Sequence, residues 1–393
     1  VWVQRGTNNR IGGPDPRDRN VVSANGLHGI ILAGQATDNL IAGNYVGTDV
    51  TGSVALGNEG LGGIMIALGA FSNVLQGNLI SGNRGSGVGI DDAGSSYNAI
   101  LGNRIGTDAT GARAIPNRAH GIWLNEPLSG FNRIGGTRPE ERNIVSGNLG
   151  AGMAINSSGN VMLGNFVGTD ITGRNPLGNA DNGVGLVRSP NMLGGATPQE
   201  ANVIAANGGF GVGASGHYNM VLGNYIGTDP SGQVPLGNAA GGVTLGGRHS
   251  IVQANVIAHT TMSADGRGGS GVSFSPEFDC TIRRNSIHHN ARVGIEGARE
   301  PPAPVIKTVG SNTLAGTACP GCEVEIFSDS EDEGRGFEGS TVADKSGAFA
   351  FSKGSGHFTD LNVTATATDR DGRTSAFSAP GRVPVSVVAR PPR

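Results

Sequence analysis

The amino-acid sequence predicts an all-β fold in which short strands wind into a solenoid, followed by a small β-sandwich. The main observation is a block of the form NxIxGNxIGTDxTG that returns four times, with small variations: NLIAGNYVGTDVTG from Asn39, NAILGNRIGTDATG from Asn98, NVMLGNFVGTDITG from Asn160 and NMVLGNYIGTDPSG from Asn219. Its aspartates follow one another at intervals of 59, 62 and 59 residues: Asp49, Asp108, Asp170 and Asp229. A period in this range is typical of solenoids, in which each unit buries its apolar face by stacking on its neighbours.

Each period contains two coils, because a related block lies between the GTD blocks: NRIGG with Ile11, NVLQG with Leu75, NRIGG with Ile134 and NMLGG with Leu193. Units begin at steps of roughly 25 to 34 residues, at Asn9, Asn39, Asn73, Asn98, Asn132, Asn160, Asn191, Asn219, Ile251 and Cys280. Within a unit, short apolar pairs alternate with polar residues between Gly and Asn, which predicts short strands joined by tight turns. Three such strands per coil predict a right-handed parallel β-helix of about 10 coils over residues 1–298.

The asparagines and aspartates of the GTD blocks are interpreted as turn residues. The asparagines are expected to stack at one corner, where their side-chain amides satisfy backbone groups in turns that accept left-handed conformations. They are Asn44, Asn103, Asn165 and Asn224. The aspartates are expected to form Asx-type turns that open a longer loop, with a calcium role as the alternative.

Beyond residue 298 the pattern changes. The Pro-rich segment 299–306 ends the periodicity and predicts a short linker. Residues 307–393 contain alternating runs such as CEVEIFS and NVTATATDRDGRTSAFS, separated by turn residues, which predict a β-sandwich. The acidic stretch from Ser328 to Gly334 is interpreted as a solvated loop, with calcium binding as the alternative.

Two resemblances follow from these residues. Units such as RNIVSGNLGAGMAI and NRIGGTRPEERNIVSGN resemble right-handed parallel β-helix repeat proteins of the pectate-lyase-like superfamily, over residues 1–298. Members of that superfamily include polysaccharide lyases, glycoside hydrolases, epimerases, adhesins and phage fibres, so the resemblance implies no single activity. The segment Asn362–Ser378 resembles the closing strands of bacterial immunoglobulin-like domains, which implies a spacer, anchor or assembly module.

Composition favours a weakly charged protein that is secreted or held at the cell surface. Only 15% of the residues are charged, the formal net charge is -3, and there are 69 glycines. Without a basic excess, nucleic acid is not an expected partner. The sequence has no apolar run of about 20 residues, so no membrane span is predicted. No signal peptide is present, and the chain is therefore expected to be mature or trimmed.

The three cysteines predict little chemistry. Cys319 and Cys322, in ACPGC, can close a small loop in an oxidising compartment. Cys280 replaces the opening asparagine of its unit and is expected to be a buried thiol. No metal site is predicted, because a zinc site built on these cysteines would need a second pair.

Outward-facing side chains are predicted from the motif Gly-apolar-x-apolar, which recurs once per coil. Strand side chains alternate, so the third residue of the motif faces out. This row contains Trp2, Ile31, Met65, Gly89, Trp123, Ala154, Gly185, Gly213, Thr244 and Ser273. A second row, two residues beyond the motif, contains Asp92, Glu126 and Arg188. Because coils stack about 4.8 Å apart, Asp92 and Glu126 are expected to be near neighbours, with Asp91 and Asn125 beside them.

This patch is the predicted sugar site. Trp123 offers a flat face for a pyranose ring, and the small neighbours Ala154 and Gly185 leave a trough. Arg188 suits a uronate carboxylate. Asp92 and Glu126 are the candidate acid and nucleophile of a retaining glycosidase, which needs two carboxylates roughly 5 Å apart. The alternative is that both carboxylates form turns on a solvated edge.

The ends of the solenoid expose unpaired backbone groups, which invite association unless a cap covers them. The C-terminal domain is expected to cover one end, and a basic group of the last coil is expected to face that junction. This group contains Arg283, Arg284, His288 and His289. The N-terminal end has no covering segment in the sequence, and apolar residues predict an interface there with another copy or a surface partner. They are Trp2, Ile31, Met65 and Leu68.

Two functions remain open. The first is a secreted bacterial surface protein with a structural, adhesive or self-assembling role, which forms filaments or binds a glycan. The second is a polysaccharide lyase or glycoside hydrolase acting in a groove around Trp123. The first is favoured, because the repeats are regular, the charge is low, and no dense aspartate cluster with an adjacent lysine supports lyase chemistry.

Overall fold

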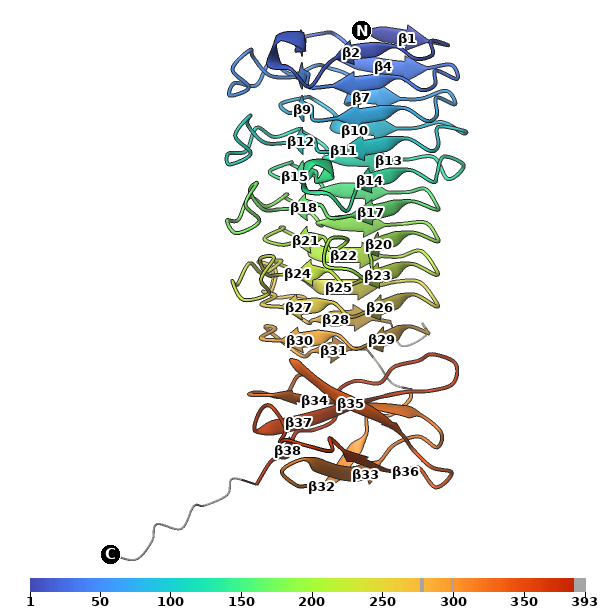
Figure 1. Ribbon diagram of the computed structural model, residues 1–393, viewed down its shortest axis with the longest axis vertical. Helices are drawn as coiled ribbons and strands as arrows, with labels where there is room; N and C mark the ends of the chain where they lie inside the picture. The colour runs from blue at the N-terminus through green and yellow to red at the C-terminus, as the bar shows by residue number, and fades with distance from the viewer. Residues whose placement is uncertain (276–278, 298–299, 385–393) are drawn as a thin grey trace, which may run out of the picture.

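The computed structural model describes residues 1–275, 279–297 and 300–384. A long solenoid and a smaller C-terminal unit follow one another along its long axis (Figure 1). The described chain is all-β apart from two single 3-10 turns, η1 (Pro16–Asp18) and η2 (Pro139–Glu141). No helix in these ranges is long and apolar enough to cross a membrane. The predicted all-β fold class is confirmed.

Three parallel sheets form the walls of the solenoid, and each coil gives one strand to each sheet. The first sheet contains β1 (Trp2–Gln4), β4 (Ile30–Ala33), β7 (Gly62–Ile66), β10 (Ser86–Ile90), β13 (Ile122–Leu124), β16 (Met153–Ile155), β19 (Val184–Leu186), β22 (Phe210–Ala214), β25 (Gly241–Leu245), β28 (Val272–Phe274) and β31 (Ile295–Glu296). The second contains β2 (Arg10–Gly12), β5 (Leu40–Ala42), β8 (Val74–Gln76), β11 (Ala99–Leu101), β14 (Arg133–Gly135), β17 (Val161–Leu163), β20 (Met192–Gly194), β23 (Met220–Leu222), β26 (Ile251–Gln253) and β29 (Thr281–Arg283). The third contains β3 (Val21–Val22), β6 (Tyr45–Val46), β9 (Leu79–Ile80), β12 (Arg104–Ile105), β15 (Ile144–Val145), β18 (Phe166–Val167), β21 (Val203–Ile204), β24 (Tyr225–Ile226), β27 (Val256–Ala258) and β30 (Ser286–His288). Each strand pairs with the strand three places later in the chain, for example β1 with β4 and β4 with β7. This is the pairing of a parallel β-solenoid of the right-handed type.

The interior is one continuous apolar stack. In β4, Ile30 and Leu32 are fully buried and Ile31 lies outside, half-buried, which is the predicted alternation. One glycine per coil lies where the third sheet turns into the first. A Cβ on Gly152 would lie 2.6 Å from Val167 Cγ1, and one on Gly183 would lie 2.5 Å from Ile204 Cγ2. The glycine that opens each outward motif is therefore required by the close approach of the third sheet's core residues.

Side-chain amides of asparagine form a ladder along each of the three corners. Asn44 shows the pattern: its Nδ2 donates to Asn78 Oδ1 in the next coil (3.1 Å) and to the Ile11 carbonyl in the preceding coil (2.9 Å). The first ladder contains Asn9, Asn39, Asn73, Asn98, Asn132, Asn160, Asn191 and Asn219. The second contains Asn20, Asn44, Asn78, Asn103, Asn143, Asn165, Asn202, Asn224, Asn255 and Asn285. The third contains Asn25, Asn58, Asn83, Asn117, Asn148, Asn179, Asn207 and Asn238.

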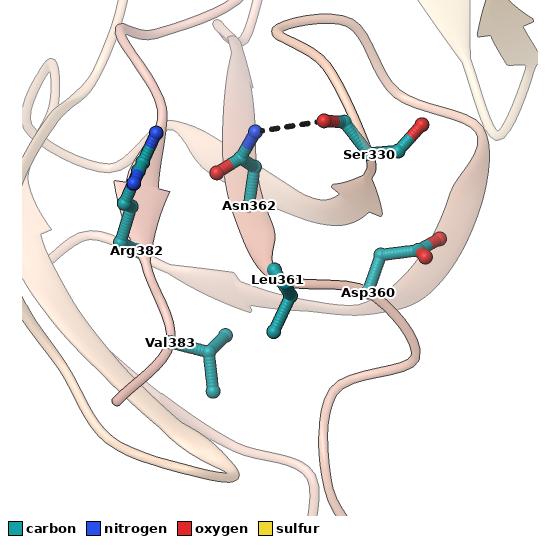
Figure 2. Close-up of a pocket in the computed structure, with 6 residues that line it drawn as sticks. All are labelled: Ser330, Asp360, Leu361, Asn362, Arg382 and Val383. Atoms are coloured by element: carbon teal, nitrogen blue, oxygen red, sulfur yellow. Dashed lines mark hydrogen bonds between the residues drawn. The ribbon is translucent and has the colours of Figure 1, made fainter. Parts of the chain in front are cut away.

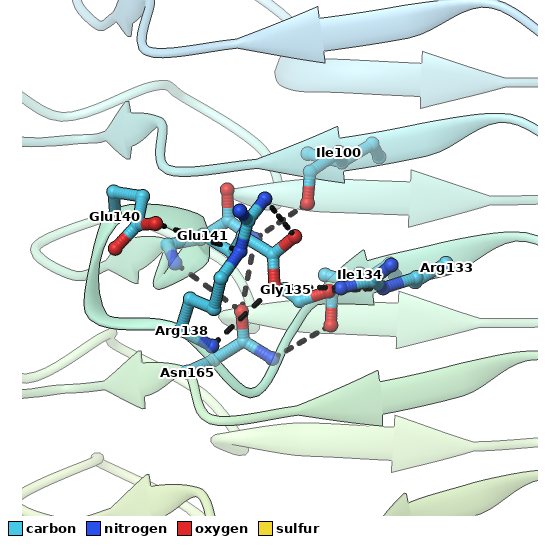
Figure 3. Close-up of polar contacts among 9 residues, drawn as sticks. Ile100, Arg133, Ile134, Gly135, Arg138, Glu140, Glu141 and Asn165 are labelled. Carbon is cyan, nitrogen blue, oxygen red and sulfur yellow. Dashed lines mark hydrogen bonds and ion pairs between the residues drawn. The ribbon is translucent and has the colours of Figure 1, made fainter. Parts of the chain in front are cut away.

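The predicted corner stack is confirmed with one correction. The four predicted asparagines share the second ladder, but asparagines of the intervening coils separate them, and two further ladders run beside it. Figure 3 shows one rung, where Asn165 donates to the carbonyl oxygen of Ile134 (2.9 Å). The same view shows buried Glu141, which ends η2 and pairs with Arg133 (2.7 Å) and Arg138 (3.0 Å) over the ladder.

The GTD aspartates form turns, as predicted. Asp108 Oδ1 accepts from the N–H groups of Ala112 (3.1 Å) and Arg113 (3.3 Å) and from the hydroxyl of Thr110 (2.7 Å). Asp49, Asp170 and Asp229 make equivalent bonds. The loops they close contact one another across alternate coils, since Ala109 N donates to Gly52 O and Ile171 N to Gly111 O. The four aspartates therefore lie along one side of the solenoid, over the third sheet.

The C-terminal unit consists of two antiparallel sheets around one apolar core. The first contains β32 (Val305–Val309), β33 (Thr313–Thr317) and β36 (Ala348–Ser352), and the second contains β35 (Gly336–Val342), β34 (Glu323–Asp329), β37 (Asn362–Thr368) and β38 (Gly381–Arg382). Residues from both sheets share the core, among them Leu314, Ile326 and Phe349. The last two residues of the predicted linker, Val305 and Ile306, belong to β32. Residues 276–278 and 298 of the predicted β-helix, residue 299 of the linker and residues 385–393 of the predicted domain lie outside the described ranges. Cys319 and Cys322 form a disulfide, and Cys280 is a free, buried thiol whose pKa burial raises to about 11.

The C-terminal unit caps the last coil by supplying the bonds that another coil would make. The backbone of Ile287 exchanges two hydrogen bonds with Gly334 (2.9 and 2.8 Å). Asn290 donates from its backbone and from Nδ2 to the two carboxylate oxygens of buried Glu333, both at 3.1 Å. Glu333 thus takes the place of the next asparagine in the third corner. Phe377 packs against the solenoid core.

Asn103→Asp is expected to destabilise the protein by about 3 kcal/mol. The substituted carboxylate cannot donate any of the three bonds that Asn103 Nδ2 makes, to the Leu75 carbonyl (2.9 Å), the Leu101 carbonyl (3.1 Å) and Asn143 Oδ1 (3.1 Å). Asn8→Asp, at an exposed position, is the matched control and is expected to change stability by less than about 0.5 kcal/mol. Calorimetric melting compares the two; equal melting temperatures would contradict the structural role of the ladder.

Glu333 is expected to make the capped end less stable as pH rises. Burial, together with the charges of Asp329 and Asp332, raises the pKa of Glu333 to about 7 from an ordinary 4.5. The folded state then holds this proton more tightly than the unfolded state. Its stabilising contribution is complete below about pH 4.5 and is lost as pH rises through about 7. The full contribution is on the order of 3 kcal/mol.

The comparison with Glu333→Gln isolates this effect. Buried His288, whose pKa burial lowers to about 4, contributes a slope of the opposite sign in both proteins, so it cancels. The melting temperature of the unmodified protein minus that of the variant should fall between pH 4.5 and pH 8. A constant difference over this range would refute the assignment.

Candidate functional site

The outward row of the first sheet lies in the predicted register. Every neighbouring pair from Trp2 and Ile31 to Thr244 and Ser273 consists of Cα partners on adjacent strands. The register extends the row by one residue, Glu296, opposite Ser273. Side chains about 30 positions apart in the sequence are therefore neighbours on this face.

Trp123 is the aromatic side chain in the middle of this row, and the residues on both sides of it are small. Its Cα partners are Gly89 and Ala154, and Gly185 follows. The ring is half-buried, and its Cε3 would lie 3.7 Å from a Cβ on Gly89. The register therefore places Trp123 beside the small residues Ala154 and Gly185 as predicted, and a sugar-binding trough there stays a prediction.

A row of hydrogen-bonded polar side chains runs beside Trp123, just after the ends of β10, β13, β16 and β19. Asn125 Nδ2 donates to Asp91 Oδ1 (3.2 Å), and Asn156 Nδ2 donates to the Asn125 carbonyl (2.9 Å). Arg188 Nε in turn donates to Asn156 Oδ1 (3.1 Å). Asn156 is missing from the predicted site, although its position two residues after Ala154 matches that of Asn125 after Trp123. Spacing from the outward residue would have identified it.

Asp92 and Glu126 serve separate turns. Asp92 has a left-handed backbone (φ 64°), and its Oδ2 accepts from the N–H of Leu68 in the preceding coil (3.0 Å). Glu126 Oε1 accepts from the N–H of Leu128 within its own turn (3.2 Å). These bonds account for both carboxylates as turn caps. A catalytic role for the pair stays a prediction.

The apolar residues of the predicted assembly surface differ widely in exposure. Trp2 is 65% exposed and Leu68 55%, and Ile31 is half-buried. Met65 is only 4% exposed, because its side chain lies over Gly89 of the next coil. Met65 therefore adds little to an exposed patch. Binding of a partner on this side stays a prediction.

The two arginines of the predicted basic group face the C-terminal unit, as expected. Arg283 pairs with Glu323, and the backbone N–H of Arg284 donates to Glu325 (2.9 Å). Burial raises the pKa of Glu325. Arg283 and Arg284 are thus used at the junction.

A pocket lies in the C-terminal unit beside β38 (Figure 2). Leu361 and Val383 supply apolar side chains, Asp360 and Arg382 lie on opposite sides, and Asn362 donates to the Ser330 carbonyl (3.1 Å). Its six lining residues include no pairing of a nucleophile with a base. This pocket therefore gives no reason to prefer it over the face around Trp123 as a saccharide site.

No protein-family model and no curated protein matches this chain. Among solved structures, the A-module of a mannuronan C-5 epimerase from Azotobacter vinelandii is similar at 14% identity and TM-score 0.30, covering 71% of this chain and 84% of that one. The Dettilon tailspike protein is similar at 12% identity and TM-score 0.37, covering 96% and 83%. A DFA-IIIase from Arthrobacter chlorophenolicus is similar at 13% identity and TM-score 0.29, covering 76% and 84%. Likeness at this level transfers no activity to this chain.

The turn-capping role of Asp92 is testable by substitution. Asp92→Ala is expected to lower stability by about 1 kcal/mol, because it removes the acceptor for Leu68 N–H and places alanine in a left-handed conformation. Asp92→Asn keeps an acceptor and tolerates this conformation, so its stability should stay within about 0.5 kcal/mol of the unmodified protein. Thermal melting distinguishes them, and two equally stable variants would contradict the assignment.

Proposed function

We propose that the protein is a secreted bacterial surface rod with a structural or adhesive role, which binds a saccharide on the flank around Trp123. The observation that carries the proposal is the unbroken register of ten coils, held by three amide ladders and closed by a bonded cap. At about 4.8 Å per coil, this gives a stiff element about 50 Å long. A rod of this kind suits a protein that holds groups at a fixed spacing.

The Trp123 flank supports saccharide binding through three features. The aromatic ring offers apolar area against a pyranose face. The small residues Ala154 and Gly185 leave room beside it. Asn125, Asn156 and Arg188 place amide and guanidinium groups along the edge, where they can bond hydroxyl groups, and Arg188 suits a carboxylate-bearing sugar.

Two further features favour an extracellular setting. The disulfide between Cys319 and Cys322 suits an oxidising compartment. The strands around Asn362–Ser378 resemble those of bacterial immunoglobulin-like domains, and we infer an assembly module of that kind. Contact with another copy or a surface partner, through Trp2, Ile31 and Leu68 with a small contribution from Met65, belongs to the same proposal.

The second candidate is a polysaccharide lyase or glycoside hydrolase. It is favoured by the position of Asp92 and Glu126 in turns of adjacent coils, beside the trough. It is disfavoured because both carboxylates already bond backbone N–H groups.

Trp123→Ala is expected to weaken saccharide binding at least about ten-fold, because it removes the largest apolar contact of the flank. Titration calorimetry against neutral and uronate-containing oligosaccharides measures the affinity. Trp2→Ala, at the far end of the same row, is the matched control and should bind as the unmodified protein does. Equal losses in both variants, or no binding by the unmodified protein, would overturn the assignment.

The same saccharides also test the second candidate. Release of reducing ends or unsaturated products that is abolished by Asp92→Asn or Glu126→Gln would establish an enzyme. We expect no turnover in the unmodified protein.

A further inference from the structure

Three histidines of the last two coils form a compact group that the proposed function does not use. His259 follows β27, His288 ends β30 and His289 follows it. One ring nitrogen from each lies within 4.8 Å of the other two. The Nδ1 atoms of His288 and His289 are 2.8 Å apart, and the ring centroids of His259 and His289 are 5.2 Å apart.

These histidines depart from the repeat. In coils without a GTD loop, the residue before the third-corner asparagine has a left-handed backbone. The earlier coils of this kind have a small residue at that position. These are Ala24, Gly82, Gly147 and Ala206. The last two coils place His259 (φ 56°) and His289 (φ 54°) at this position. His288 is the register partner of Ala258 and so also replaces a small residue. The winding of the solenoid does not require imidazoles at these positions.

Two of the three imidazoles lie in surroundings that favour the neutral form, which has a lone pair for a metal. Burial lowers the pKa of His288 to about 4 and also lowers that of His259. His289 is exposed and His259 half-buried, so both rings can rotate about their side-chain torsions, whereas His288 is 3% exposed and fixed in place. Neutral imidazole is the ligand that zinc, copper and nickel share.

We propose that His259, His288 and His289 bind a divalent transition metal, with zinc as the expected ion and water as the fourth ligand. Zn–N bonds of about 2.0–2.1 Å in a tetrahedral site require nitrogens about 3.4 Å apart. Metal binding would therefore move the Nδ1 atoms of His288 and His289 apart from their present 2.8 Å, and would bring the nitrogen of His259 to about 3.4 Å from both. This site goes beyond the proposed function and does not depend on it.

The metal would tie the last two coils together beside the cap. His259 and His288 belong to consecutive coils, and Asn290, which binds Glu333 of the cap, follows His289 directly. Arg335 of the cap lines the same pocket as His288, so its guanidinium charge opposes a cation there. The affinity of the site is therefore expected to depend on Arg335.

Zinc titration of the tag-free, chelator-treated full chain tests the proposal. We expect one zinc ion per chain by calorimetry and a melting temperature that rises with zinc concentration. His289→Ala and His259→Gln should each weaken binding at least about ten-fold. His357→Ala, an exposed histidine of the C-terminal unit, is the matched control and should leave binding unchanged. Arg335→Ala should tighten binding, since it removes a nearby positive charge.

The visible absorption spectrum of bound cobalt(II) provides a second measurement, which distinguishes loss of the metal site from loss of folding. The unmodified chain should give the intense visible absorption of tetrahedral cobalt(II), and His289→Ala should lose it while keeping its circular dichroism spectrum. Absence of stoichiometric zinc binding would overturn the proposal. So would equal zinc affinity in the unmodified protein, His289→Ala and His259→Gln.

Discussion

The structure depends on hydrogen bonding between asparagine amides at the corners of the solenoid. A corner interrupts the strand ladder and leaves backbone groups that neither flanking sheet can bond. An amide carries a donor and an acceptor on one short side chain, so it bonds the coil behind and the coil ahead at once, as Asn44 does with Ile11 and Asn78. Because the ladders repeat at all three corners, each sheet keeps its register over the whole length. The outward rows are a consequence of that register.

The same constraint explains the chemistry of the junction. A ladder that ends leaves the last amide and the last strand edges without partners, and burying them would cost free energy. The cap supplies replacements of matching geometry: the Glu333 carboxylate for Asn290, and the hydroxyl of Thr374 for the N–H of Ile282 (3.0 Å). These bonds require acidic and polar groups in a buried interface, which is why the carboxyl groups of Glu325 and Glu333 have raised pKa values. The ladder therefore determines the residue types at the junction.

Much of the architecture was predictable from the sequence, because residues that are one repeat apart in a solenoid lie next to each other on adjacent coils. The period identified the coils, and alternation within each strand identified the outward row, including the alignment of Trp123 with Gly89 and Ala154. Features that depend on one neighbouring coil were not predictable. Met65 is covered because the next coil has glycine at the same position. Asp92 bonds backward to Leu68 because its own backbone is left-handed, a conformation that the strand pattern does not encode. The asparagines of the first ladder were identified as the starts of the units but were not expected to stack. Those of the third ladder were not identified, because the GTD loops separate them from the recurring blocks in every second coil.

Positions that break the repeat carry the most information about function. Each position of a coil accepts few residue types, because the coils above and below restrict it. Some departures have structural explanations: Ser250 and Cys280 replace asparagine in the first ladder, and each still makes a hydrogen bond there, Ser250 with Asn219 N (3.3 Å) and Cys280 with Gly247 O (3.3 Å). Trp123 and the imidazoles of His259 and His289 have no such explanation, since small residues occupy the equivalent positions of neighbouring coils. The indole and imidazole rings at these positions add apolar surface and ligand atoms that the stacking of the coils does not require. Saccharide binding and metal binding are accordingly proposed for these positions, whereas the regular positions build the solenoid.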